Sequence, residues 1–92
     1  MVSVTDRAKE RLKRILSSNA EDASQGLRLC SRVTGEYDLI VDWEKEGDQV
    51  VEYEGARILL LAEDVRRSLD GGVVDFVHAD GRLRLIMPAE YF

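Results

Sequence analysis

The spacing of apolar residues changes once along this chain, and that change constrains the fold more than any other feature. Near the start, apolar side chains recur at helical spacing and form one stripe: Ala8, Leu12, Ile15 and Leu16. From Gly26 onward, apolar and polar side chains mostly alternate, which is the period of a strand that buries one face. A helix followed by a run of strands predicts an α+β fold.

The order of elements follows from these patterns and from the turn residues between them. Thr5 or Asp6 can cap the first helix. We then expect strands at 26–33, 37–43, 50–53 and 57–61, a second helix at 63–69, and strands at 73–77 and 82–87. Thr34-Gly35-Glu36 predicts a hairpin, and the unbroken apolar run Ile58–Leu61 predicts burial on both faces. The predicted architecture is small mixed or antiparallel β-sheets packed with two short helices.

The size and charge of the chain limit the classes of function. Its 92 residues form a single domain, 1–92, because two independent cores would not fit. Eighteen acidic and thirteen basic side chains give a net charge of −5, which argues against nucleic-acid binding. The first helix carries a basic group that we interpret as a solvated face: Arg7, Lys9, Arg11, Lys13 and Arg14.

Cysteine usage and hydropathy indicate the compartment. The single cysteine, Cys30, excludes an internal disulfide and favours a reducing environment. The start of the chain lacks the apolar run of a signal peptide, and the longest apolar stretch, Ile58–Ala62, is too short to cross a bilayer. We therefore expect a cytoplasmic protein with no membrane partner.

The sequence offers few groups for catalysis. His78 is the only histidine, and it would need the fold to bring Cys30 or a serine beside it before it could act as a base. An exposed histidine at a strand end is the simpler interpretation. The glycines are scattered and form no phosphate-binding loop, so we expect neither an enzyme nor a bound cofactor.

Metal ligands are equally sparse, because one cysteine and one histidine cannot build a structural zinc site. Cys30 and His78 are the minor candidates for metal binding, and no metal site is expected. The carboxylates of Glu44, Glu46 and Asp48 lack the number and glycine placement of a calcium loop, so a solvated turn is expected there. The aromatic residues at strand positions are expected in the core: Tyr37, Trp43 and Tyr53.

Five segments match, in order and with compatible spacing, segments of one known family: Val4–Leu12, Gly26–Leu29, Tyr37–Trp43, Asp48–Gly55 and Leu69–Phe76. The second contains Gly-Leu-Arg-Leu, which resembles that family's first strand. The last contains Leu-Asp-Gly followed by Asp-Phe. Over nearly its whole length, the chain resembles the HesB/IscA family, the A-type carriers of iron–sulfur cluster assembly.

The resemblance implies a dimeric or tetrameric protein with mixed sheets, two helices, and a cluster or iron held by three cysteines. One cysteine lies in a glycine-cysteine-serine-glycine loop after the first strand, and two lie in a cysteine-glycine-cysteine near the C-terminus. Here Gly35 matches the first glycine of the loop, but Glu36 and Tyr37 follow it, and the sequence closes with residues 88–92, Pro-Ala-Glu-Tyr-Phe. None of the three family positions holds a cysteine.

Two hypotheses follow from this departure. In the first, a HesB/IscA-like domain has lost its cluster ligands and is a non-catalytic protein-interaction module, for which a homodimer is compatible with the small core. In the alternative, an iron or cluster carrier uses an unorthodox site that includes Cys30, His78 and carboxylates. Clusters normally need four thiolates, whereas two subunits would supply only two through Cys30, so we interpret Cys30 as a small packed strand residue.

Overall fold

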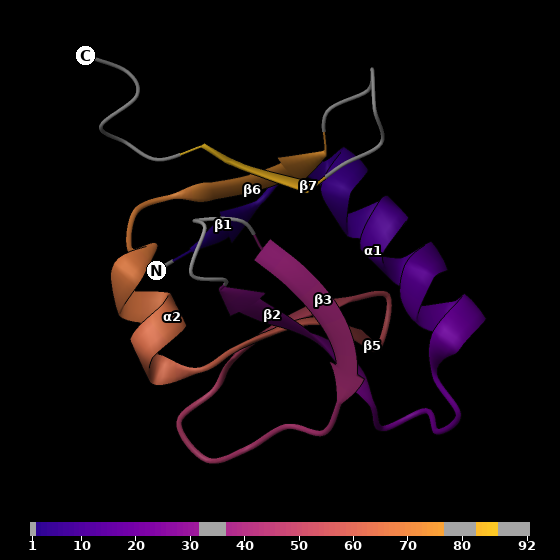
Figure 1. The fold of residues 1–92 in the computed structure, drawn as a ribbon. Coiled ribbons are helices and arrows are strands. Elements are labelled where there is room, and N and C mark those ends of the chain that lie inside the picture. Colours follow the sequence, from indigo (N-terminus) through magenta and orange to yellow (C-terminus); the bar gives the residue numbers. More distant parts are fainter. Residues whose placement is uncertain (1, 32–36, 77–82, 87–92) are drawn as a thin grey trace.

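A computed structural model describes residues 2–31, 37–76 and 83–86 of the chain (Figure 1). Its elements in chain order are β1 (Ser3–Val4), α1 (Asp6–Asn19), β2 (Gly26–Ser31), β3 (Tyr37–Asp42), β4 (Gln49–Tyr53), β5 (Ala56–Leu61), α2 (Glu63–Ser68), β6 (Val73–Phe76) and β7 (Leu83–Ile86). The α+β class is confirmed. Each long element lies where the period of its apolar residues places it.

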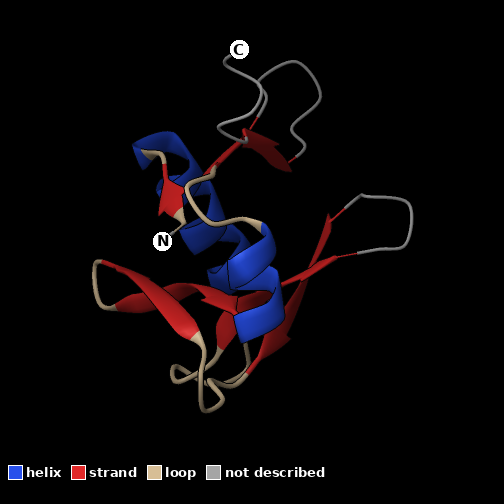
Figure 2. Cartoon of the chain, turned by 90° about the vertical axis from the view of Figure 1, so that its left-hand side faces the viewer, coloured by secondary structure: helices blue, strands red, loops and turns tan. Residues whose placement is uncertain are grey.

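The strands form two small sheets. One has four strands in the order β3-β2-β5-β4, and the other has three in the order β1-β6-β7. Helix α1 contacts β5 of the larger sheet and β6 of the smaller one, and Figure 1 shows it running beside both. Figure 2 shows the two sheets at opposite ends of the molecule, with helices between them. The two sheets therefore share one core along α1.

Parallel pairing is the part of the topology that the turn signals did not indicate. The short strand β1 pairs with β6 in parallel, and β2 pairs with β5 in parallel. Hairpins account for the antiparallel pairs β2–β3, β4–β5 and β6–β7. Turn signals indicate only neighbours along the chain, whereas strands distant in sequence also lie side by side.

Helix α1 begins where a hydroxyl can satisfy a free backbone amide. Thr5, and not Asp6, is the N-cap: its Oγ1 accepts a hydrogen bond from the Ala8 amide at 3.3 Å. The predicted stripe faces inward, since Ala8, Leu12 and Leu16 are buried. The helix continues through the polar residues up to Asn19, whose side-chain amide donates to the Ile15 carbonyl.

Strand β5 is the centre of the larger sheet, and its four residues from Ile58 to Leu61 are fully buried, as predicted. Its register against β4 shifts at Ile58, because Leu59 pairs with Val51 while Arg57 pairs with Glu52. Such a shift places two consecutive side chains on one face. Ile58, Leu59 and Leu61 accordingly all belong to the core cluster, whereas Leu60 pairs across from Arg28.

Close packing between β2 and β5 depends on a glycine. A Cβ atom at Gly26 would lie 2.6 Å from the Arg57 carbonyl oxygen, which is closer than side chains tolerate. At this same end of β5, Glu54 and Gly55 both adopt positive φ, which produces the tight turn from β4. These two positions fix the register of the central strand.

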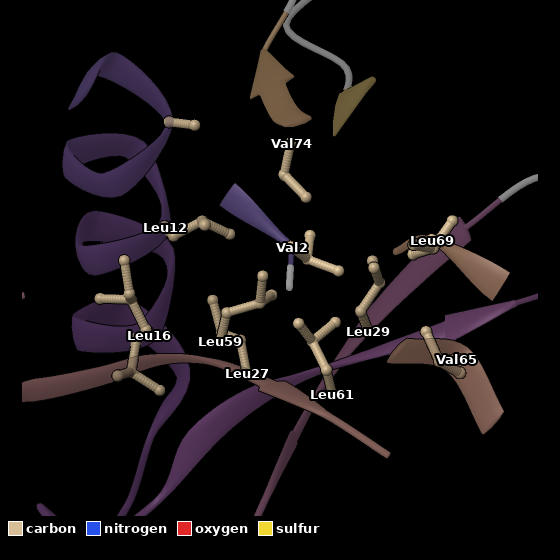
Figure 3. Packing of buried hydrophobic residues seen from close by; sticks show 12 residues of the cluster. Val2, Leu12, Leu16, Leu27, Leu29, Leu59, Leu61, Val65, Leu69 and Val74 are labelled. Carbon is tan, nitrogen blue, oxygen red and sulfur yellow. The ribbon is translucent and has the colours of Figure 1, made fainter. Parts of the chain in front are cut away.

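The hydrophobic core joins residues from both helices and both sheets (Figure 3). Leu12 and Leu16 of α1 point toward Leu27 and Leu59 of the larger sheet, and Val2 lies near Val74 of the smaller one. Val65 and Leu69 close the core from the side of α2, as the sequence predicted. Tyr37 and Tyr53 pack against its margin, which confirms their expected place. None of the helices in the described part of the chain is long and apolar enough to span a membrane.

The chain offers the same residue type at a buried and an exposed strand position. Replacing the fully buried Ile58 by Ala should lower the free energy of unfolding by about 2–5 kcal/mol, because the cavity at the centre of the core cannot close. Ile40→Ala, at a side chain that is 48% exposed, should cost less than about 1 kcal/mol. Urea denaturation followed by circular dichroism measures both. Equal costs would contradict the assignment of β5 as the central strand.

Candidate functional site

Cys30 lies one residue before the end of β2, in the strand position that the sequence predicted. It pairs with Asp38 of β3, and its side chain is half-buried. Within the described residues, the one hydrogen-bond partner of the Cys30 thiol is the carbonyl oxygen of Arg28, which lies 4.0 Å from Sγ. The thiol is therefore held within a regular strand and not in a loop.

The described residues do not gather metal ligands around this thiol. Across 2–31, 37–76 and 83–86, no group of three or more histidine, cysteine, aspartate or glutamate side chains is placed to hold a metal ion. His78, the other minor candidate, lies outside the described residues. The same is true of Gly35 and of residues 88–92, the positions where the resemblance implies cluster ligands.

A buried ion-pair network, centred on Arg28 of β2, lies beside Cys30 on the same face of the sheet. The Arg28 side chain is 9% exposed and the Asp48 side chain 2% exposed. Arg28 donates to both carboxylate oxygens of Asp48, at 2.9 and 2.7 Å, and its Nε donates to Asp42 at 2.7 Å. A fourth bond, from Nη2 to the Trp43 carbonyl at 3.1 Å, attaches the loop that follows β3.

The electrostatics of this network are mutually stabilising. Hydrogen bonds from Arg28 hold the pKa of Asp48 below its ordinary value, although burial acts in the opposite direction. The pKa of Asp42 is also lowered, first by Arg28 and then by the backbone amide of Trp43. The carboxylates in turn raise the pKa of Arg28, chiefly through Asp48. At neutral pH all three groups are charged and paired.

This network corrects two expectations from the sequence. Alternation along the strand puts Arg28 on the face opposite Leu27 and Leu29, which was expected to be exposed, yet Arg28 is buried because the loop of residues 43–48 covers it. Asp48 was assigned to a solvated turn with Glu44 and Glu46, but its carboxylate is almost fully enclosed. Both side chains are hydrophilic, so the apolar period gave no sign of their burial. The only sign of their burial in the sequence was that Arg28 and Asp48, 20 residues apart, carry opposite charges and could pair.

A second ion pair joins α1 to β6. The buried carboxylate of Asp75 accepts from Thr5 Oγ1 at 2.6 Å and from Arg7 Nε at 2.7 Å, and it forms a further short contact with Arg7 Nη2. Arg7 was predicted to belong to a solvated basic face. Its side chain is 60% exposed, but its charged end is bound to Asp75, so the N-terminal turn of α1 is anchored to the smaller sheet.

Two large apolar side chains are exposed at one edge of the larger sheet. Ile40 of β3 is 48% exposed, and Trp43, directly after β3, is 55% exposed. The prediction that Trp43 packs in the core was wrong. Alternation along the strand was extended one residue too far, because β3 ends at Asp42 and the chain there turns to cover Arg28.

Comparisons with known proteins give relationships at the level of structure alone. No protein-family model and no curated protein matches this chain. Among solved structures, Escherichia coli SufA, involved in biosynthesis of iron–sulfur clusters, has a TM-score of 0.73 at 22% identity, covering 95% of this chain and 85% of SufA. The chain has the fold of SufA.

IscA with a [2Fe-2S] cluster has a TM-score of 0.62 at 21% identity, covering 96% of this chain and 86% of IscA. An Aquifex aeolicus protein solved by NMR has a TM-score of 0.64 at 22% identity, covering 95% of this chain and 91% of its own. The sequence resemblance implied a fold of mixed sheets. The structural match to SufA and IscA confirms it.

Loss of one carboxylate from the Arg28 network should destabilise this SufA-like fold in a pH-dependent way. Asp48→Asn should lower the free energy of unfolding by about 3 kcal/mol at pH 7, because Arg28 stays buried with half its partners. The folded pKa of Asp48 is lowered, so its stabilisation is present above the unfolded carboxyl pKa of about 3.9 and is lost as the pH falls through the folded value.

The difference in free energy of unfolding between the wild type and Asp48→Asn should therefore become smaller below about pH 4. Urea denaturation at a series of pH values measures it. Glu46→Gln is the matched control, because Glu46 lies exposed in the same loop. If the difference in free energy of unfolding stays constant from neutral to acidic pH, the charge of Asp48 does not stabilise the fold.

Proposed function

We propose that this chain is a non-catalytic domain with the SufA and IscA fold that does not carry an iron–sulfur cluster and acts by binding another protein. The observation that carries the proposal is the single thiol of the sequence, which lies inside a strand. The fold alone says little about activity, because function depends on the residues at a site.

The donor set of the chain does not fit a cluster. Iron–sulfur clusters are normally held by four cysteine thiolates, and a pair of these chains would bring two. Cys30 is half-buried, and its nearest cross-strand neighbour is Asp38, a hard oxygen donor. Arg28, on the same face, is already bound by the carboxylates of Asp42 and Asp48.

Contacts within the chain hold the described part of the fold together. The core is filled by apolar side chains from both helices and both sheets, and the buried charges are paired within the chain. A domain of this kind keeps its shape when cluster ligands are absent. Its exposed apolar side chains, Ile40 and Trp43, then remain as features that core packing does not explain, and they favour contact with a partner protein.

Anaerobic reconstitution tests this proposal. Purified protein is incubated with ferrous iron, sulfide and a thiol reductant, desalted, and examined by visible absorption and by iron and sulfide analysis. IscA, which has been solved with a [2Fe-2S] cluster, serves as the positive control. The chain should show no stoichiometric cluster absorption, because it lacks converging thiolates.

A stoichiometric cluster on the wild-type chain would overturn the proposal. Cys30→Ser then identifies the site: loss of iron in this variant would establish the carrier hypothesis that includes Cys30. Iron retained by both proteins would place the metal on oxygen or nitrogen ligands, which also contradicts a domain without cargo.

A further inference from the structure

We propose that a pocket at the C-terminal end of α1 binds the free N-terminus of another polypeptide, through its ammonium group and its first carbonyl oxygen. This inference rests on the proposed function, in which the chain acts by binding another protein, and it names the chemistry of one contact. Three features of the pocket carry it: an amide donor without a partner, a negative electrostatic environment and an apolar wall.

The pocket lies where the loop after α1 meets the turn between β4 and β5. Its volume is about 410 Å³. The lining comes from the last turn of α1, from the loop that follows and from residues 54–56. All of these residues belong to the described part of the chain. Pockets of this size hold small ligands, so the terminal residue of a polypeptide fits.

Gln25 gives the pocket a hydrogen-bond donor in a fixed orientation. It is 7% exposed, and its Oε1 accepts from the backbone amides of Glu21 and Asp22, at 2.9 and 3.1 Å. The opposite end of the amide, Nε2, has no hydrogen-bond partner among the described residues. Arg57 Nε is the only described side-chain polar atom that is fully enclosed without a hydrogen bond, so Gln25 Nε2 still reaches open space. Since Gln25 lines the pocket, its free amide hydrogens suit a carbonyl oxygen bound there.

The surroundings of this donor favour a positive group. Helix α1 ends at Asn19, and the carbonyl groups of its last turn form the negative end of the helix dipole. No basic residue lies in that turn to compensate it. Glu21 follows the helix, is exposed, and forms no ion pair with any described residue. A cation in the pocket therefore meets both the helix end and an unpaired carboxylate.

The other two acids of the lining are already engaged, and neither is required for binding. The Asp22 carboxylate accepts from the amide and the hydroxyl of Ser24, at 2.8 and 2.7 Å. Glu54 forms an ion pair with Lys13 at 3.4 Å. No basic residue lines the pocket. The negative charge available to a ligand is thus that of Glu21 and of the end of α1.

The wall of the pocket is apolar and made mostly of small residues: Leu16, Ala20, Ala23, Gly55 and Ala56. It leaves room for an aliphatic side chain. The described residues place no group of three metal ligands here, so a metal ion does not match the site. A polypeptide N-terminus carries an ammonium group, a carbonyl oxygen and a side chain on adjacent atoms, which matches all three features. A free amino acid would instead bring its carboxylate toward Glu21.

An NMR titration of isotope-labelled protein tests this inference. The chain has three side-chain amides, in Asn19, Gln25 and Gln49, so the Gln25 signal can be assigned directly. The probe is the peptide amide Leu-Ala-Ser-Ala with a free N-terminus. It should shift the Gln25 signal to saturation and leave Gln49, which is bonded to the backbone of Val2, unchanged.

Two further ligands test the two ends of the recognised group. The N-acetylated peptide, which has no positive charge, should bind about tenfold more weakly or not at all. Isoamylamine has the ammonium group and the aliphatic chain but no carbonyl, and it should also bind about tenfold more weakly than the peptide.

Two variants separate the pocket from the rest of the acidic surface. Glu21→Gln removes the unpaired charge and should weaken the peptide by roughly fivefold. Asp64→Asn, at an exposed position of α2 beyond the opposite end of β5, should bind as the wild type does. Circular dichroism confirms that both variants are folded.

Three results would overturn the inference: no shift of the Gln25 signal up to millimolar peptide, equal binding of the acetylated peptide, or wild-type affinity in Glu21→Gln. Leucinamide has the same terminal groups without the following residues. Binding of leucinamide but not of the peptide would assign the pocket to a small amine and overturn the protein partner. Cluster reconstitution reports separately on the proposed function, because a chain that binds both a cluster and this peptide contradicts the absence of cargo alone.

Discussion

The complete burial of β5 is the constraint on which the rest of the structure depends. A strand at the centre of a small sheet must be covered on both faces, and this chain covers the two faces by different means. Leu59 and Leu61 join the apolar core beneath α1, with Ile58 turned to the same side by the register shift. Leu60 instead lies beside Arg28, under a loop held by ion pairs. The second cover is ionic.

The apolar period was enough to predict most of this fold. The stripe from Ala8 to Leu16 gave α1, and alternation gave the strands of the larger sheet within one or two residues. The continuous run from Ile58 to Leu61 gave the central strand, because burial on both faces leaves no polar position. These signals are local and come from hydrophobic burial, which dominates the energetics of a small domain.

The remaining features depend on contacts between distant residues or on polar groups. The pairing of β1 with β6 joins Ser3 to Val73, and no local pattern announces a two-residue strand. Burial of Arg28 requires Asp48, which the fold alone brings near. The exposure of Trp43 follows from that same ion pair, because the chain leaves the sheet at Asp42 to cover Arg28. The errors at Arg28, Asp48 and Trp43 therefore arose where charge pairing, and not hydrophobicity, decided the path of the chain.

We propose that a fold shared with SufA and IscA is maintained here without the thiolates that hold a cluster. Iron and acid-labile sulfide measured per chain, on protein isolated from cells without exposure to oxygen, test it most directly. We expect a colourless protein with far less than one iron and one sulfide per two chains, whose thermal unfolding is unchanged by a chelator. A brown protein with near-stoichiometric iron and sulfide, destabilised when they are removed, would contradict it.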